Sequence, residues 1–320
     1  MKQSAMKLCN RAACCAALVV TSGMVLADGF RGHHGGPHID QNELNLEIET
    51  FNIGDSKSIG GDAVMSATGI RLESEYEMKN GISFAFGYEL WRYNWSSTLN
   101  MPFAPGTTAT PWSEFTTYQF GMAYEHEYSD QWEFNYYIEA ETSFEKEMAN
   151  SNEYELGADF SYEHSKSWTT TINVNYEYLD AEGAELGLDL EIEWNDHATE
   201  GWSGEFEISS EFPESMIRYH FNSGLSAAVF YGDGGTNTIR LSDTSPLPGL
   251  QGGYLEDEYT TIGFRVDYGI HKGGKLSFNL QQNSNRLLSF QRTGVEEDIT
   301  YQFEDSVEFF MRYTLEFYPD

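Results

Sequence analysis

Residues 70–90 read IRLESEYEMKNGISFAFGYEL, and this stretch decides the fold. On both sides of Asn80-Gly81, apolar or aromatic residues recur at nearly every second position, with charged, polar or small residues between them. A period of two is typical of a β-strand whose two faces meet different surroundings. Asn-Gly between two such runs is the strongest short-range signal for a hairpin. The stretch therefore predicts a long antiparallel β-hairpin.

The same alternation recurs along the chain, and helical spacing does not compete with it over a comparable length. Fifteen segments read as strands: 43–53, 64–78, 82–95, 114–128, 132–145, 153–164, 168–179, 184–194, 202–212, 216–231, 236–243, 257–270, 275–290, 296–303 and 307–317. If these strands close into a barrel, their number should be even, as it is in single-chain bacterial barrels. We therefore predict an all-β protein with about 14 strands, and 12 or 16 are the alternatives.

Composition narrows the function classes. The 320 residues include 51 acidic and 18 basic side chains, which gives a formal net charge of −33, and 15% of the residues are aromatic. A chain so rich in aromatic residues is not a disordered acidic tail. Its negative charge repels phosphate backbones, so we expect no binding to nucleic acid.

The N-terminal residues have the features of an export signal. Lys2, Lys7 and Arg11 precede the apolar run 12–20, and small residues lead to a cleavage site after Ala27. The apolar run is shorter than the roughly 20 residues that a membrane-spanning helix needs. We predict a signal peptide over 1–27, a periplasmic linker over 28–42 and a barrel over 43–320. All three cysteines lie in the signal peptide, so disulfides are not expected in the exported chain.

Strand length favours a membrane barrel over a soluble sandwich. Many predicted strands run 11 to 16 residues, whereas strands of soluble sheets usually have about five or six. Tryptophan and tyrosine prefer the headgroup level of a membrane, and two aromatic groups lie near opposite strand ends. One group is Trp132, Trp168, Trp194 and Trp202, and the other is Trp91, Tyr93, Trp95 and Trp112.

These features resemble the bacterial outer-membrane β-barrel (porin-like) superfamily, and the resemblance covers the chain after residue 42. The last strand, Val307–Phe317, is similar to a C-terminal insertion signal, although Tyr318-Pro319-Asp320 follow its final aromatic residue. The resemblance implies a transmembrane antiparallel up-and-down barrel in the outer membrane, surrounded by membrane lipid and lipopolysaccharide.

In a barrel of this kind the polar faces point into the lumen. The candidate acidic residues of the lumen are Glu73, Glu75, Glu77, Glu133, Glu139, Glu141, Glu155, Asp159 and Asp189. Crowded carboxylates attract counter-cations. The sequence thus predicts a diffusion pore or transporter with a cation-preferring lumen, and small cationic solutes and divalent cations are the candidate ligands. The alternative is a non-transporting envelope barrel (structural, adhesive or receptor-like) whose loops bind a partner.

Chemistry beyond transport has little support. His33, His34 and His38 lie within six positions and are candidate ligands for a divalent metal. The segment is rich in glycine and has no evident fourth ligand, so a plain polar linker is the simpler interpretation. No histidine pairs locally with a serine on one strand face, so we expect neither enzymatic activity nor a cofactor.

Overall fold

The computed structural model describes residues 42–318 apart from 99, 102–103, 106–108, 182, 196–197, 209–212, 271–272 and 292–298. The predicted signal peptide and the candidate metal ligands His33, His34 and His38 lie outside the described residues, so both stay predictions.

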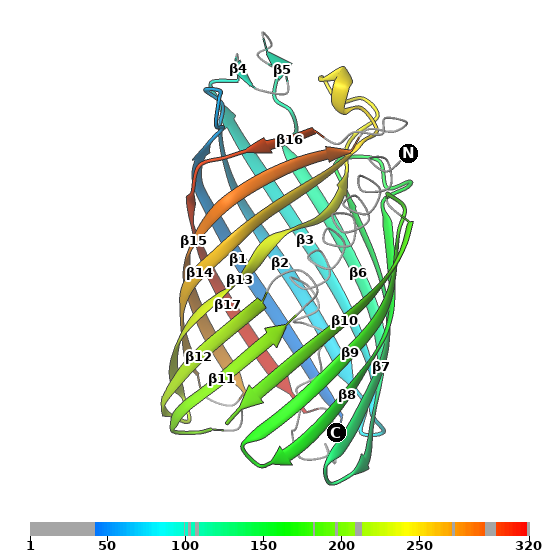
Figure 1. Cartoon of the computed structure of the whole chain (residues 1–320), viewed down its shortest axis with the longest axis vertical. Coiled ribbons are helices and arrows are strands. Elements are labelled where there is room, and N and C mark those ends of the chain that lie inside the picture. Colours follow the sequence, from blue (N-terminus) through cyan, green and yellow to red (C-terminus); the bar gives the residue numbers. More distant parts are fainter. Residues whose placement is uncertain are drawn as a thin grey trace, which may run out of the picture.

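Fourteen long strands form the wall of the molecule (Figure 1). They are β1 (Glu43–Lys57), β2 (Val64–Glu77), β3 (Ile82–Ser96), β6 (Glu114–Ser129), β7 (Trp132–Phe144), β8 (Asn152–Ser165), β9 (Trp168–Leu179), β10 (Gly183–Trp194), β11 (Gly201–Ile208), β12 (Pro213–Asn222), β13 (Leu225–Arg240), β14 (Tyr254–Gly269), β15 (Gly274–Gln291) and β17 (Ser306–Phe317). Three short strands lie outside this series: β4 (Asn100–Met101) pairs with β5 (Ala104–Pro105), and β16 (Ile299–Gln302) pairs with β15. A single 3₁₀ turn, η1 (Pro248–Leu250), follows β13.

The wall closes on itself. Successive long strands are antiparallel, and the sheet closes because β1 pairs with β17 while β14 pairs with β15. The contact between β13 and β7 is parallel. The β1–β17 register runs from Leu44↔Phe317 to Ile53↔Glu308. The predicted antiparallel up-and-down barrel of fourteen strands is confirmed. Among the described residues, none of the helical segments has the length and hydropathy to cross a membrane.

The strand count was correct although three predicted segments were wrong. The predicted strand 216–231 contains most of β12, the turn Ser223-Gly224 and the beginning of β13. A two-residue turn leaves the odd–even alternation unchanged, so the pattern passed through it without a break. The predicted strand 236–243 overlaps the end of β13, and the predicted strand 296–303 contains the short β16. The prediction merged two strands of the wall into one segment and included two segments that are not separate strands of the wall. Fifteen predicted segments therefore correspond to fourteen strands of the wall.

The two faces of the wall differ as the alternation predicts. The outward side chains of Phe86, Phe120 and Leu188 are half exposed or more. Gln119, directly before Phe120, and Asp189, directly after Leu188, are buried. A closed wall leaves its backbone groups paired and presents an apolar surface, which is what a strand needs in lipid.

The two ends of the barrel are unlike. The short connections 130–131, 166–167 and 223–224 lie at the same end as Glu43 and Phe317, and we call this the turn end. The longer connections 97–113, 145–151 and 241–253 lie at the opposite end, which we call the loop end. The short turns thus lie at the same end of the barrel as the beginning of β1 and the end of β17.

The barrel becomes narrower toward the loop end because five strands stop short. The β11–β12 ladder ends at Ile208↔Pro213 and the β12–β13 ladder at Ser215↔Tyr231, but β13 continues through Gly232 to Arg240. There it reaches β7, and Arg240 pairs with Phe144 (Figure 1). We call the part of the barrel at the level of this junction the neck; its wall is β7, β6, β3, β2, β1, β17 with β16, β15, β14 and β13.

Apolar side chains fill the neck. The buried cluster contains Phe51, Ile53, Met65, Trp91, Tyr93, Trp112, Phe115, Ile239, Leu241, Leu247, Leu250, Leu255, Leu288, Phe290 and Phe303. Some contacts cross the interior: the Trp112 ring, next to β6, lies 5.8 Å from the Phe290 ring of β15. Barrels of about eight strands are wide enough only for their own side chains. A neck of nine strands is close to that size, which explains why it is packed.

This packing corrects one prediction about the aromatic residues. Trp91, Tyr93 and Trp112 were expected on the membrane-facing surface, but they are 6%, 6% and 2% exposed and lie inside the neck, with Trp95 packed against them. For Trp91, Tyr93 and Trp95 the reason is their parity on β3, where odd positions share the face of the buried Glu89. At the turn end, Trp132, Trp168 and Trp202 are exposed on the outer surface, as predicted, and Trp194 is partly exposed.

Candidate functional site in the barrel lumen

The predicted acidic residues lie on the lumen side of four strands. Alternation places Glu73, Glu75 and Glu77 on the inward face of β2, Glu133, Glu139 and Glu141 on that of β7, Glu155 and Asp159 on that of β8, and Asp189 on that of β10. Glu139, Glu141, Asp159 and Asp189 are buried and the others are partly buried. Their effect on the passage of ions is untested and stays a prediction.

Positive and negative charges are separated across the lumen. The inward bases Arg71, Arg218, Arg265, Lys275 and Arg312 belong to β2, β12, β14, β15 and β17, which form one side of the barrel together with β1 and β13. We call this side the arginine wall. The six strands β6–β11 form the other side, and their sequences contain neither Lys nor Arg. We call the inward faces of β7–β11 the acidic wall.

Carboxylates stand directly opposite one another on the acidic wall. The register aligns Glu139, Glu155, Glu177 and Glu185 in one row across β7, β8, β9 and β10. A second row joins Glu191, Glu207 and Glu214 across β10, β11 and β12. Like charges in directly opposed positions destabilise a sheet. The rows therefore create a strong local demand for positive charge.

Neutral donors hold several of these carboxylates in place. Tyr137 Oη donates to Glu155 Oε1 at 2.7 Å, and Gln119 Nε2 donates to Glu139 Oε2 at 3.1 Å. Asn173 Nδ2 donates to Asp159 Oδ1 at 2.6 Å. Amide and hydroxyl donors satisfy carboxylate oxygens without cancelling their charge. These donors thus hold the carboxylates in position without supplying positive charge.

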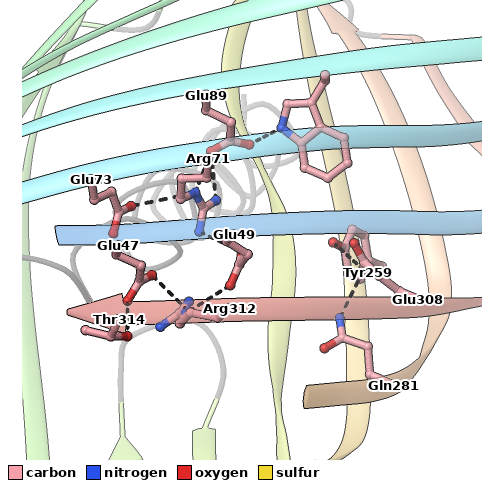
Figure 2. Close-up of polar contacts among 11 residues, drawn as sticks. Glu47, Glu49, Arg71, Glu73, Glu89, Tyr259, Gln281, Glu308, Arg312 and Thr314 are labelled. Carbon is pink, nitrogen blue, oxygen red and sulfur yellow. Dashed lines mark hydrogen bonds and ion pairs between the residues drawn. The ribbon is translucent and has the colours of Figure 1, made fainter. Parts of the chain in front are cut away.

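On the arginine wall the charges neutralise one another (Figure 2). Arg71 lies between Glu89 and Glu49, with nitrogen–oxygen distances of 2.8 and 3.6 Å. Arg312 Nε lies 2.8 Å from Glu49 Oε2 and 2.9 Å from Glu47 Oε1. The indole nitrogen of Trp91 donates to the other oxygen of Glu89. This wall therefore presents paired charges to the lumen.

A cavity of about 220 Å³ lies between the two walls, below the neck. Its lining includes Arg71, Arg265 and Arg312 from the arginine wall and Glu205 and Glu207 from the acidic wall. Glu308 of β17 also lines it, at the level where polar interior gives way to the apolar neck.

Glu308 is fully buried and only half satisfied. Its Oε2 accepts hydrogen bonds from Asn283 Nδ2 at 2.7 Å, Gln281 Nε2 at 3.0 Å and Tyr259 Oη at 3.4 Å (Figure 2). Its Oε1 accepts no hydrogen bond from the described residues. In the sequence, a single Glu between Val307 and Phe309 looks like any other polar position of an alternating strand, so no sequence signal distinguishes Glu308.

Hydrogen bonds between two loops fasten the neck where β13 meets β7. The Glu145 amide donates to Arg240 O at 2.9 Å, the Ser242 amide donates to Glu145 Oε2 at 2.9 Å, and the Asp243 amide donates to Glu147 Oε2 at 3.2 Å. We call these contacts the latch. Burial raises the pKa of the Glu145 carboxyl above its usual value, and the Ser242 amide partly offsets that rise.

The histidines found from sequence lie apart from the acidic rows. His126 and His164 are exposed on the outer surface. His220 of β12 lies 2.9 Å from Ser203 Oγ of β11, a pairing across strands that the sequence alone did not reveal. Among the described residues, no group of three His, Cys, Asp or Glu side chains is arranged to hold a metal ion.

No protein-family model matches the sequence, and no curated protein matches it. Among solved structures, an outer-membrane channel from Pseudomonas putida F1 shares 11% identity, with 90% of this chain and 98% of that chain covered, at a TM-score of 0.45. The P. putida toluene transporter TodX shares 9% identity over 95% and 94% of the two chains at a TM-score of 0.44. The NanC porin shares 12% identity over 84% and 98% at a TM-score of 0.39. The porin-like architecture of the chain rests on its own strand order, register and alternating faces.

Proposed function

We propose that the chain is an outer-membrane pore through which small polar solutes diffuse, with a preference for cations. The observation that carries the proposal is the closed fourteen-strand wall, apolar outside and charged inside. Lipid accepts the outer surface of such a wall, while its inner surface suits water and ions.

The preference for cations follows from the separation of charge. The arginine wall pairs its bases with Glu47, Glu49, Glu89 and Asp267. The acidic wall has rows of opposed carboxylates on strands whose sequences lack Lys and Arg. The lumen as a whole is therefore negative, and a negative lumen concentrates cations and repels anions.

Planar-bilayer recording under a salt gradient tests both parts of the proposal. We expect single-channel conductance with a reversal potential of the sign that indicates cation flux. Combining Glu139→Gln, Glu155→Gln and Asp189→Asn should move that potential toward zero. A matched control neutralises three acids in the connections, Asp130→Asn, Glu304→Gln and Asp305→Asn, and should leave the potential unchanged. Anion preference in the unaltered protein would refute the proposed selectivity.

The packed neck favours a second candidate, a non-transporting envelope barrel. Side chains of the loop 241–253 take part in the apolar cluster that fills the neck, and the latch fastens this loop to 145–151. If neither the unaltered protein nor variants with a loosened neck conduct ions, this second candidate replaces the pore.

A further inference from the structure

The cavity below the neck combines three features that bear on what it could bind. It has carboxylates in excess of bases, an acceptor oxygen without a donor, and aromatic walls. Its volume of about 220 Å³ is smaller than the roughly 300–1,000 Å³ of pockets for drug-sized ligands. It therefore suits a small solute.

The arginines that line the cavity are already neutralised. Arg71 and Arg312 share Glu49, and each has a further carboxylate within 2.9 Å. Arg265 Nε lies 2.8 Å from Asp267 Oδ1. An anionic solute would have to displace these partners, whereas a cationic solute would not.

Glu308 supplies the unmet acceptor. The three donors on its Oε2 are neutral side chains, and its Oε1 has no donor among the described residues. Asn279 also lines the cavity, and its Oδ1 likewise lacks a donor there. A buried acceptor without a partner is costly, and a ligand that donates to it removes the cost.

Aromatic rings form another part of the lining. Trp91, Phe230, Tyr259 and Phe310 come from four strands around the cavity. Ring faces attract cations, more strongly where water is excluded, and they also bind apolar bodies. Together with two free acceptor oxygens, they match a protonated amine that carries a small apolar or aromatic body.

We propose that this cavity is a binding site for small organic ammonium ions. The ammonium group donates to Glu308 Oε1 and Asn279 Oδ1, and the organic body lies among the rings. The inference deepens the proposed function and rests on it for the route by which the solute arrives. The contacts within the site depend only on the cavity.

Binding is measurable on the purified full barrel in detergent by calorimetry, with phenethylammonium as the probe. Phenylethanol is the neutral comparator and phenylacetate the anionic one, and both keep the ring. We expect saturable binding of the amine and much weaker binding of the other two. Glu308→Gln should weaken amine binding by about tenfold to a hundredfold, because a hydrogen bond to a charged group is lost. Glu127→Gln, which removes an exposed carboxylate on β6, is the control and should bind as the unaltered protein does.

A second variant guards against loss of folding at Glu308. Asn279→Leu removes one proposed acceptor and leaves the hydrogen bonds of Glu308 in place, so it should also weaken binding. Equal binding of amine and alcohol, or unchanged binding in Glu308→Gln, would overturn the inference. Amine binding by a barrel that does not conduct would refute the pore and keep the site, while conductance without amine binding would do the reverse.

Discussion

At the scale of single residues, glycines inside strands mark the places where aromatic rings lie across the interior. A Cβ added at Gly69 would come within 2.0 Å of the Phe51 ring and 2.5 Å of Leu90 O. A Cβ added at Gly157 would likewise clash with the Tyr137 ring, and one added at Gly263 would clash with the Phe230 ring. A glycine inside a strand is unfavourable because it loses more conformational entropy on folding than other residues. The close approach of a ring or backbone explains why glycine stands at these positions.

Gly69→Ala should therefore destabilise the barrel by about 1–3 kcal/mol, since the added methyl group forces the Phe51 ring and the β3 backbone to move. Gly204→Ala is the matched control, because its added Cβ meets nothing closer than 3.4 Å. Denaturant unfolding of both variants in detergent, followed by tryptophan fluorescence, measures the difference. Equal midpoints for the two variants would contradict this account.

Arg71, labelled in Figure 2, is a second residue whose contribution to stability depends on its neighbours. Arg71→Met removes the guanidinium that lies between Glu49 and Glu89, which are both almost completely buried. Glu49 keeps Arg312, whereas Glu89 loses its ion pair with Arg71. Breaking a buried ion pair by removing one partner costs about 3–5 kcal/mol.

Arg71→Met should thus lower the free energy of unfolding by an amount of that order, and Arg71→Met combined with Glu89→Gln should recover part of it. Denaturant titration of the single and double variants provides the measurement. If the double variant is less stable than Arg71→Met alone, the charge on Glu89 is not the source of the loss.

At the scale of single elements, odd–even parity assigns each side chain to lipid or lumen. On β6, Phe120 is 55% exposed and Gln119 is 8% exposed, although they are adjacent in sequence. The same rule placed Trp91 and Tyr93 inside the neck, where an argument from ring type alone put them at the membrane surface. Parity is the stronger predictor, because a one-residue shift would turn every side chain of a strand to the opposite face.

Single cysteine substitutions test this parity directly, because the chain has no natural cysteine after residue 15. In proteoliposomes, Phe120→Cys should react with a lipid-soluble maleimide and resist a charged one, and Gln119→Cys should show the opposite order. Comparable reaction of both variants with the charged reagent would mean that the outer face meets water and would refute the membrane assignment.

At the scale of the whole molecule, a wide barrel of fourteen strands carries a narrower, packed neck. The neck forms because β8–β12 end before they reach its level, so that β13 pairs directly with β7 at Arg240↔Phe144. The latch holds that junction with backbone amides that donate to Glu145 and Glu147. In the proposed pore, ion flow at the loop end depends on how firmly this neck is closed.

Removing the two side-chain acceptors of the latch with Glu145→Ala and Glu147→Ala together should raise the mean conductance or the frequency of opening in bilayer recordings. The variant leaves the wall strands intact, so its thermal stability should change little. Lys146→Ala changes an exposed residue between the two and is the control. Unchanged gating in the double variant would exclude the latch as a barrier to ion flow.

The sequence by itself determined the class of fold, the approximate strand boundaries and the face on which each carboxylate lies. These follow from a local period of two and from turn residues, which need no knowledge of distant contacts. It failed at Ser223-Gly224, where a tight turn preserves the period, and at the aromatic residues of β3, where parity was not followed to the strand end.

Only the tertiary structure decided which strands end early, which carboxylates share a row and where Glu308 lies. The meeting of β7 with β13 and the closure of β1 against β17 depend on register between strands far apart in the chain, and the carboxylate rows depend on register carried across several consecutive strands. Register is set by the packing of many side chains at once, so a single stretch of sequence does not contain it. The separation of charge across the lumen, and the cavity beneath the neck, arise at that level.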